Sequence, residues 1–191
     1  MAERDLGPAL LAIARSSIGA QFGLGAIAEV SHPALAKHGA TFVTLRKDGE
    51  LRGCIGSIEP RRPLGDDVRE NALASAFRDP RFPPLTRMEF GRTLIEVALL
   101  SPAELMEVRD EEDLLAQVRP CEDGLVIAYG GHRATFLPQV WETIAEPRDF
   151  VAALKRKAGL PEDFWSTQVN VARYGVTKWA EADFPLDEVE R

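Results

Sequence analysis

The chain has 191 residues, enough for one large domain or two small ones with a substantial core, and its composition (45% apolar and 28% charged residues) is ordinary for a soluble globular protein. Its formal net charge of −7 argues against a nucleic-acid-binding role, because contacts with phosphates require a basic surface. It contains no run of about 18 apolar residues, so we expect no membrane-spanning segment.

The first half of the chain alternates helical and strand-like patterns. The acid-containing N-terminus, Met1 to Asp5, lacks the charged-then-apolar pattern of a signal peptide, which indicates a cytoplasmic protein. Prolines fix their own φ and keep the preceding residue out of the helical region, so the proline-rich segment after the second helix must be extended. The predicted elements are a helix over 5–22, a hairpin over 41–58, a helix over 63–78, an extended segment over 79–85 and a strand over 93–100.

The first hairpin has a well-defined turn. Asp48-Gly49 lies between two β-rich runs and favours a two-residue turn, because both residues tolerate positive φ. This turn predicts that Leu45 opposes Arg52 and that Val43 opposes Cys54. Alternation along the strand then puts Arg52 and Cys54 on one face of the sheet.

The second half repeats the order hairpin, helix, strand. Antiparallel hairpins that alternate with helices indicate an α+β fold rather than a doubly wound parallel sheet. No linker rich in Gly, Ser or Pro separates the halves, so we expect one compact unit, with a possible duplicated hairpin–helix–strand unit over 41–100 and 124–180. The predicted elements are a helix over 110–118, a hairpin over 125–137 around Gly130-Gly131, helical segments around Val140-Trp141 and over 150–158, and a strand over 169–179 with an irregularity at Gly175.

Cys54 is the candidate nucleophile. A guanidinium beside the thiol, such as that of Arg52 on the same face, would favour the reactive thiolate. A catalytic cysteine also needs a nearby base, and His132 is the candidate, although its place beside a hairpin turn fits a solvated side chain as well. Cysteine is also among the most buried residue types, so the sequence leaves both a chemical and a packing role open.

Several other residues are candidates for ligand binding. Arg52 either binds an anion or pairs with a carboxylate, for which Glu96 in a neighbouring strand is available; a solvated sheet face is the alternative. Asp79 and Arg81 project from the rigid proline-rich segment, which either carries function or simply ends a helix. The two glycines within Leu51–Gly56 indicate a bulge or a close approach of backbone or ligand. The candidate ligand-binding residues are therefore Arg52, Gly53, Gly56, Asp79, Arg81 and Glu96.

The sequence contains no motif for a cofactor or a metal. It has no phosphate-binding loop, dinucleotide-binding fingerprint or zinc-protease motif. Its two cysteines lie far apart in the chain and make neither a zinc site nor a disulfide framework. We therefore expect no cofactor and no metal.

Taken together, the motifs resemble those of the AmmeMemoRadiSam system protein A family, which is built on an AMMECR-type domain. The resemblance covers nearly the whole chain, from about the first helix to Trp179, and predicts one domain over residues 5–185. The motifs that carry it are, in order, Phe42-Val43-Thr44-Leu45, Leu51-Arg52-Gly53-Cys54-Ile55-Gly56, Asp79-Pro80-Arg81-Phe82-Pro83-Pro84-Leu85, Phe136-Leu137-Pro138-Gln139-Val140-Trp141 and Lys157-Ala158-Gly159-Leu160.

The resemblance implies a single compact α+β domain with a larger and a smaller lobe on antiparallel sheet. It also implies a cleft near Leu51–Gly56 that would hold the candidate residues, and partnership with a Memo-like protein (related to extradiol dioxygenases) and a radical S-adenosylmethionine enzyme. It implies no particular reaction. Lys155 stands where similar proteins often carry Cys, which argues against a mechanism with a second thiol.

Two functions remain open at this point. The first is an enzyme, or an enzyme component, whose cleft binds a small molecule and uses Cys54 with Arg52 as activator or anion binder. The second is a non-catalytic binding or scaffold module that docks a partner protein through a patch around Arg81-Phe82. A reactive and accessible thiol would distinguish the first function from the second.

Overall fold

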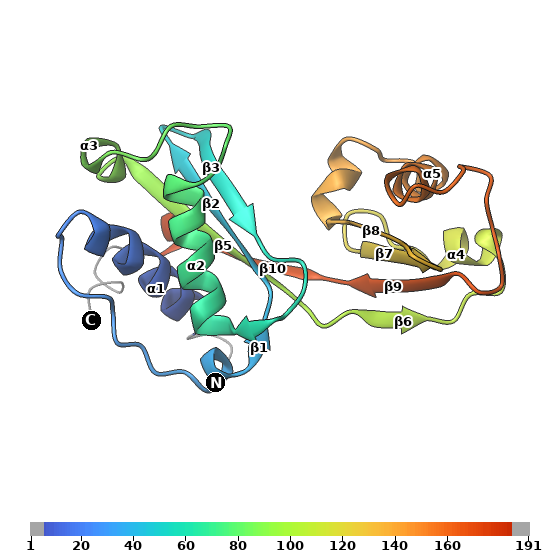
Figure 1. Ribbon diagram of the computed structural model, residues 1–191, viewed down its shortest axis with the longest axis horizontal. Coiled ribbons are helices and arrows are strands. Elements are labelled where there is room, and N and C mark those ends of the chain that lie inside the picture. Colours follow the sequence, from blue (N-terminus) through green and yellow to red (C-terminus); the bar gives the residue numbers. More distant parts are fainter. Residues whose placement is uncertain (1–5, 185–191) are drawn as a thin grey trace. The chain divides into compact units, whose positions relative to one another are not determined.

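The computed structural model describes residues 6–184 and combines helices with antiparallel strand pairs, so the predicted α+β class is confirmed. The chain divides into two compact units (Figure 1). One comprises residues up to Leu100 together with those from Thr177 onward, and the other runs from Ser101 to Val176. Both limits of the predicted domain, residues 5 and 185, lie outside the described residues.

A four-stranded sheet with strand order β10-β5-β2-β3 forms the centre of the first unit. Its strands are β2 (Thr41–Lys47), β3 (Glu50–Gly56), β5 (Thr93–Leu100) and β10 (Val176–Ala180). Two helices, α1 (Leu6–Gln21) and α2 (Leu64–Phe77), lie on one face of this sheet (Figure 1). The shorter elements are η1 (Pro33–Ala36), β1 (His38–Gly39), β4 (Arg62–Pro63), α3 (Arg87–Phe90) and η3 (Glu181–Asp183).

The alternation of side chains along β2 separates the two faces of this sheet. Val43 and Leu45 are fully buried and belong to the same apolar cluster as side chains of α1 and α2. Phe42, Thr44 and Arg46 alternate with them and are half-buried. Because successive side chains of a strand point to opposite faces, these three lie on the face away from α1 and α2, which we call the helix-free face.

The second unit is built on another four-stranded sheet, with strand order β6-β9-β7-β8. Its core includes Phe150, whose ring stacks on that of Trp141 with the ring centroids 3.7 Å apart. The elements are β6 (Glu104–Met106), α4 (Glu111–Gln117), β7 (Gly124–Tyr129), β8 (His132–Phe136), η2 (Pro138–Glu142), α5 (Pro147–Lys157) and β9 (Asn170–Tyr174).

The two units pair their strands in the same order. In the first unit β5 lies beside β2 and β2 beside β3; in the second, β9 lies beside β7 and β7 beside β8. All four pairings are antiparallel, and in each unit a helix separates the hairpin from the third strand in sequence. The repeated hairpin–helix–strand order predicted from the sequence is therefore present in the topology.

One predicted element differs from the structure, and one helical segment is shorter than an α-helix. The run over 169–179 forms two strands, β9 and β10, in different sheets. It is interrupted at Gly175, whose carbonyl accepts from the Ser101 amide and whose amide donates to Ser101 Oγ, both at 2.9 Å. The helical segment predicted around Val140-Trp141 is the short 3₁₀ helix η2, with Pro138 at its start.

Among residues 6–184, no helix has the length and apolar character needed to cross a membrane.

Candidate functional site

The hairpin of β2 and β3 has the predicted turn but a different register. Asp48 and Gly49 have φ values of 54° and 86°, which are typical of a type I′ turn. Beyond the turn, Arg46 opposes Leu51 and Leu45 opposes Gly53, so Arg52 is an extra residue in β3 and forms a β-bulge.

The bulge overturns the pairings predicted from the turn alone. Thr44, and not Val43, opposes Cys54, and Leu45 does not oppose Arg52. Side chains opposite each other in an antiparallel pair share a face, so Cys54 lies with Thr44 on the helix-free face. One inserted residue is enough to move Cys54 from the face of the buried Val43 to the opposite face.

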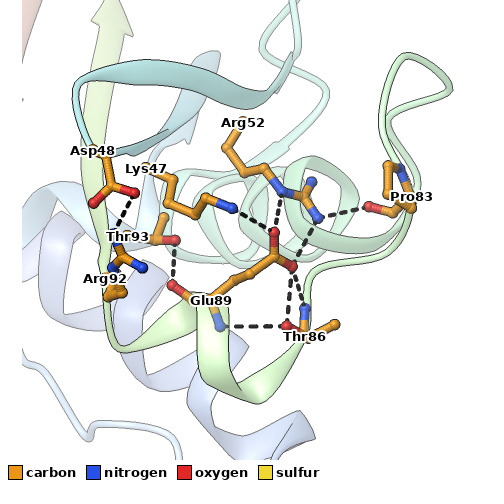
Figure 2. Close-up of polar contacts among 8 residues, drawn as sticks. All are labelled: Lys47, Asp48, Arg52, Pro83, Thr86, Glu89, Arg92 and Thr93. Atoms are coloured by element: carbon orange, nitrogen blue, oxygen red, sulfur yellow. Dashed lines mark hydrogen bonds and ion pairs between the residues drawn. The ribbon is translucent and has the colours of Figure 1, made fainter.

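Arg52 faces the other way and pairs with a different acid from the predicted one. Figure 2 shows its guanidinium reaching Glu89 in α3, with Nε 3.1 Å from Oε1 and Nη2 3.2 Å from Oε2. Nη2 also donates to the Pro83 carbonyl at 2.9 Å, and the side chain is 8% exposed. The Lys47 ammonium donates to the same Glu89 carboxylate at 3.0 Å.

Lys47 alternates with the buried residues of β2, so Glu89 and Arg52 lie on the helix-bearing side of the sheet. The prediction that Arg52 and Cys54 share a face is therefore wrong. The predicted Arg52–Glu96 pair is also wrong, because Arg46 donates to Glu96 instead, with its Nε 2.7 Å from Oε1.

Glu89 is a site residue that was not among those predicted from the sequence. Arg52, the Thr86 amide and Lys47 all donate to its carboxylate, and they hold the pKa of Glu89 well below its usual range. Glu89 also completes a capping box with Thr86 at the start of α3. The Thr-x-x-Glu spacing of a capping box was the one sequence signal for this carboxylate.

Gly53 and Gly56 are explained by close packing. A Cβ at Gly53 would lie 2.2 Å from the backbone oxygen of Ser75 in α2, and one at Gly56 would lie 2.2 Å from the ring of Phe42. Ser75 Oγ also accepts from the Ile55 amide at 2.9 Å, so α2 lies directly against β3. Both glycines therefore allow neighbouring groups to approach the strand closely.

Asp79 and Arg81 hold the outer edge of β3. This strand is at the edge of the sheet, so its outward backbone groups lack a neighbouring strand. The Cys54 amide donates to Asp79 Oδ2 at 2.8 Å, and Arg81 Nη2 donates to the Cys54 carbonyl at 3.0 Å. Arg81 also bonds to both carboxylate oxygens of Asp79, and this guanidinium, with the Cys54 amide, lowers the pKa of Asp79 strongly.

The Cys54 side chain lies in a row of polar groups that crosses three strands. Thr44 Oγ1 donates to Cys54 Sγ at 3.3 Å, and Thr44 in turn opposes Glu96 on β5. Hydrogen bonding to Asp79 raises the pKa of Arg81, and the same guanidinium donates to the Cys54 carbonyl. We call Cys54, Thr44 and Glu96 the Cys54 row. It combines a thiol, a hydroxyl donor and a carboxylate, and the Arg81 guanidinium is bonded to the carbonyl of Cys54.

His132, the predicted base, belongs to the second unit, whereas Cys54 belongs to the first. Its ring Nδ1 donates to the Ala158 carbonyl at 2.9 Å, which connects β8 to the end of α5.

Lys155, at the position where a second thiol was considered, is fully buried, and its ammonium lies 3.0 Å from the Glu111 carboxylate. In the part of the chain that the structure describes, no group of three or more His, Cys, Asp or Glu side chains is placed to hold a metal ion.

Comparisons with known proteins agree with the fold. A protein of Sulfolobus acidocaldarius is 38% identical over 194 residues, which cover 97% of this chain and 86% of that protein. Protein MJ0810 of Methanocaldococcus jannaschii is 39% identical over 148 residues, or 74% of this chain and 71% of that protein. The crystal structure of the uncharacterized protein PH0010 from Pyrococcus horikoshii matches with a TM-score of 0.74 and 30% identity, over 92% of this chain and 91% of that one.

The match to a family model is equally extensive. The AMMECR1 model covers residues 11–179, which include every motif of the resemblance found in the sequence. The prediction of an AMMECR-type domain is confirmed, and the chain belongs to the AMMECR1 family.

Proposed function

We propose that the protein binds a small electrophilic molecule at the Cys54 row and that the Cys54 thiolate is the group that contacts it. The observation that carries this proposal is the placement of the thiol. Cys54 Sγ accepts from the Thr44 hydroxyl, and the Arg81 guanidinium donates to the carbonyl of the same residue. A cysteine sulfur is a nucleophile toward electrophilic carbon, and hydrogen-bond donors around it can orient a bound molecule.

The other residues of the Leu51–Gly56 stretch support this assignment by their structural roles. Arg52 is bonded to Glu89, and the two glycines accommodate Ser75 and Phe42. Cys54 is the remaining residue of the stretch with reactive chemistry, and its side chain is half-buried. Glu96, also half-buried in the same row, offers a carboxylate acceptor to a bound molecule.

The test is the rate at which iodoacetamide alkylates Cys54 in the folded protein, measured against pH in a Cys121→Ser background. We expect alkylation without unfolding, and a rate at neutral pH that falls roughly two- to fivefold in Arg81→Gln, because that change removes the cation bonded to the Cys54 carbonyl and leaves Asp79, which is bonded to the Cys54 amide, without its partner. Arg69→Gln, which changes an exposed arginine on α2, is the matched control and should leave the rate unchanged. Labelling only after denaturation would rule the proposal out.

A second proposal concerns partners, and an exposed apolar residue supports it. Met88 in α3 is 87% exposed, and it follows closely after the exposed Pro83 and Pro84. These residues continue from the predicted docking patch at Arg81-Phe82, and an extended exposed surface of this kind suits protein contacts. We propose that it docks a Memo-like protein or a radical S-adenosylmethionine enzyme. Purified candidates of each class should bind the wild type and lose affinity for Met88→Lys, whereas Cys54→Ser should bind normally; absence of binding to either class would contradict the proposal.

A further inference from the structure

The face of the sheet on which Cys54 lies depends on one residue, Arg52, which comes two positions earlier in the same strand. A two-residue turn at Asp48-Gly49 with an unbroken ladder would place Cys54 opposite Val43, which is fully buried against the helices. The structure has Cys54 opposite Thr44, because Arg52 is inserted as a bulge. A shift of one residue in register exchanges the two faces of a strand. The bulge therefore decides whether the thiol lies in the core or on the helix-free face.

Among the contacts that hold the bulged strand, those of the inserted residue are the ones at the bulge itself. The Arg52 guanidinium makes a two-point contact with Glu89, at 3.1 and 3.2 Å, and a further bond to the Pro83 carbonyl at 2.9 Å (Figure 2). The Arg52 side chain is only 8% exposed, so loss of these bonds would leave a buried guanidinium without partners.

Glu89 is in turn fixed by groups outside the bulge. Thr86 donates to Oε2 through its amide and its hydroxyl, both at 3.0 Å, and Lys47 donates to Oε1. A carboxylate held in this way is a fixed anchor, and a planar guanidinium fork matches it in one orientation. Arg52 thus joins β3 to α3, which lies 37 residues further along the chain.

We propose that Arg52 is a positioning residue for Cys54. Its pair with Glu89 keeps β3 in the bulged register, and that register presents the thiol on the helix-free face beside Thr44. Arg52 acts through the backbone of β3 and not as a cation next to sulfur. The functional consequence rests on the proposed role of Cys54, whereas the register itself is measurable without any ligand.

Disulfide trapping measures the register directly. In a Cys121→Ser background, Thr44→Cys would place a second thiol opposite Cys54 in the bulged register, and Val43→Cys would do so in the unbulged one. Directly opposed residues have Cβ atoms about 4.5–5.5 Å apart, close enough for a disulfide after small adjustments. Mild oxidation followed by mass spectrometry should show the Thr44→Cys bridge in strong excess over the Val43→Cys bridge.

Adding Arg52→Met should lower this preference by at least about tenfold without reversing it, because the Asp79–Arg81 bonds to Cys54 and the close packing of Gly53 on Ser75 favour the same register. Arg92→Met is the matched control, because Arg92 pairs with Asp48 at the turn of the same hairpin, at 2.8 Å, yet is exposed (Figure 2). It should leave the ratio unchanged. In single-cysteine protein that remains folded, Arg52→Met should also slow alkylation of Cys54 at every pH, whereas loss of a neighbouring cation would slow it chiefly at neutral pH.

Glu89→Gln keeps the size of the anchor while removing its charge, and it serves as the second variant if Arg52→Met does not fold. A folded variant of either kind that keeps the original ratio of the two bridges and the wild-type alkylation rate would overturn the positioning role. An inert Cys54 in wild-type protein with the expected trapping pattern would instead contradict the proposed function and leave the positioning role standing.

Discussion

Asp79 takes the place of a neighbouring strand for Cys54. Its carboxylate accepts from the Cys54 amide at 2.8 Å, while its partner Arg81 donates to the Cys54 carbonyl at 3.0 Å. One ion pair thereby satisfies both backbone groups of an edge residue. Edge strands expose such groups to unwanted pairing with other chains, and a side-chain clamp is one way to prevent it. The Asp79–Leu85 segment therefore has a structural role beside any functional one.

Asp79→Asn should destabilise the protein by about 1–3 kcal/mol, because the amide loses the charge-assisted bonds to Arg81 and leaves a buried group poorly satisfied. Urea denaturation followed by circular dichroism measures this change. Asp66→Asn is the matched control: Asp66 is paired with Arg69 but is 57% exposed, so its loss should cost less than about 0.5 kcal/mol. Equal losses in the two variants would contradict the clamp.

Gly53→Ala should be more damaging than Gly56→Ala. The new methyl at Gly53 would meet a backbone oxygen of α2 at 2.2 Å, which moves only with the helix, whereas at Gly56 it would meet the Phe42 ring, a side chain. We expect a loss of about 1–3 kcal/mol or more for Gly53→Ala. Thermal unfolding of both variants checks the order. Gly131→Ala, where no atom lies within 4 Å of the new methyl, should be nearly neutral.

Stability should fall in acid through Asp79 and Glu89. Their folded-state pKa values are lowered, chiefly by Arg81 and Arg52 respectively. A lowered pKa means that each carboxylate stabilises the fold fully above its unfolded-state pKa of about 4, and that this contribution is lost as pH falls further through the folded-state value. The free energy of unfolding should be nearly flat from about pH 7 to 5 and decline below about pH 4.

Denaturation of wild type and Glu89→Gln at a series of pH values tests this origin. The variant lacks one of the two titrating groups, so its stability should be lower at neutral pH and should decline less steeply in acid. An identical slope in both proteins would show that Glu89 does not contribute to the acid transition.

Thr44→Val should slow alkylation of Cys54 at neutral pH by about two- to fivefold, because it removes the hydroxyl that donates to Sγ at 3.3 Å. The side chain keeps nearly the same size, so the unfolding free energy should change by less than about 1 kcal/mol. Thr177→Val, at an exposed position of β10, is the control. An unchanged rate in Thr44→Val would remove Thr44 from the proposed site.

The sequence by itself determined the family, the α+β class and most of the elements. Asp48-Gly49 predicted the turn, the three prolines of the 79–85 segment predicted extended chain, and the apolar run over 93–100 matched β5. These signals are local, since they depend on the φ preferences of a residue and on the spacing of apolar side chains within a few positions. They could also identify Cys54 as a chemically notable residue.

Only the tertiary structure decided which groups surround Cys54. The bulge at Arg52 depends on Glu89, which is distant in sequence and carries no local mark beyond its capping box. Without that contact the turn alone predicts the opposite face for the thiol, and it assigns Arg52 to the wrong acid. A strand register is sensitive to a single residue, whereas helix and strand patterns are not, so the chemistry of the site rests on the long-range pair that fixes the register.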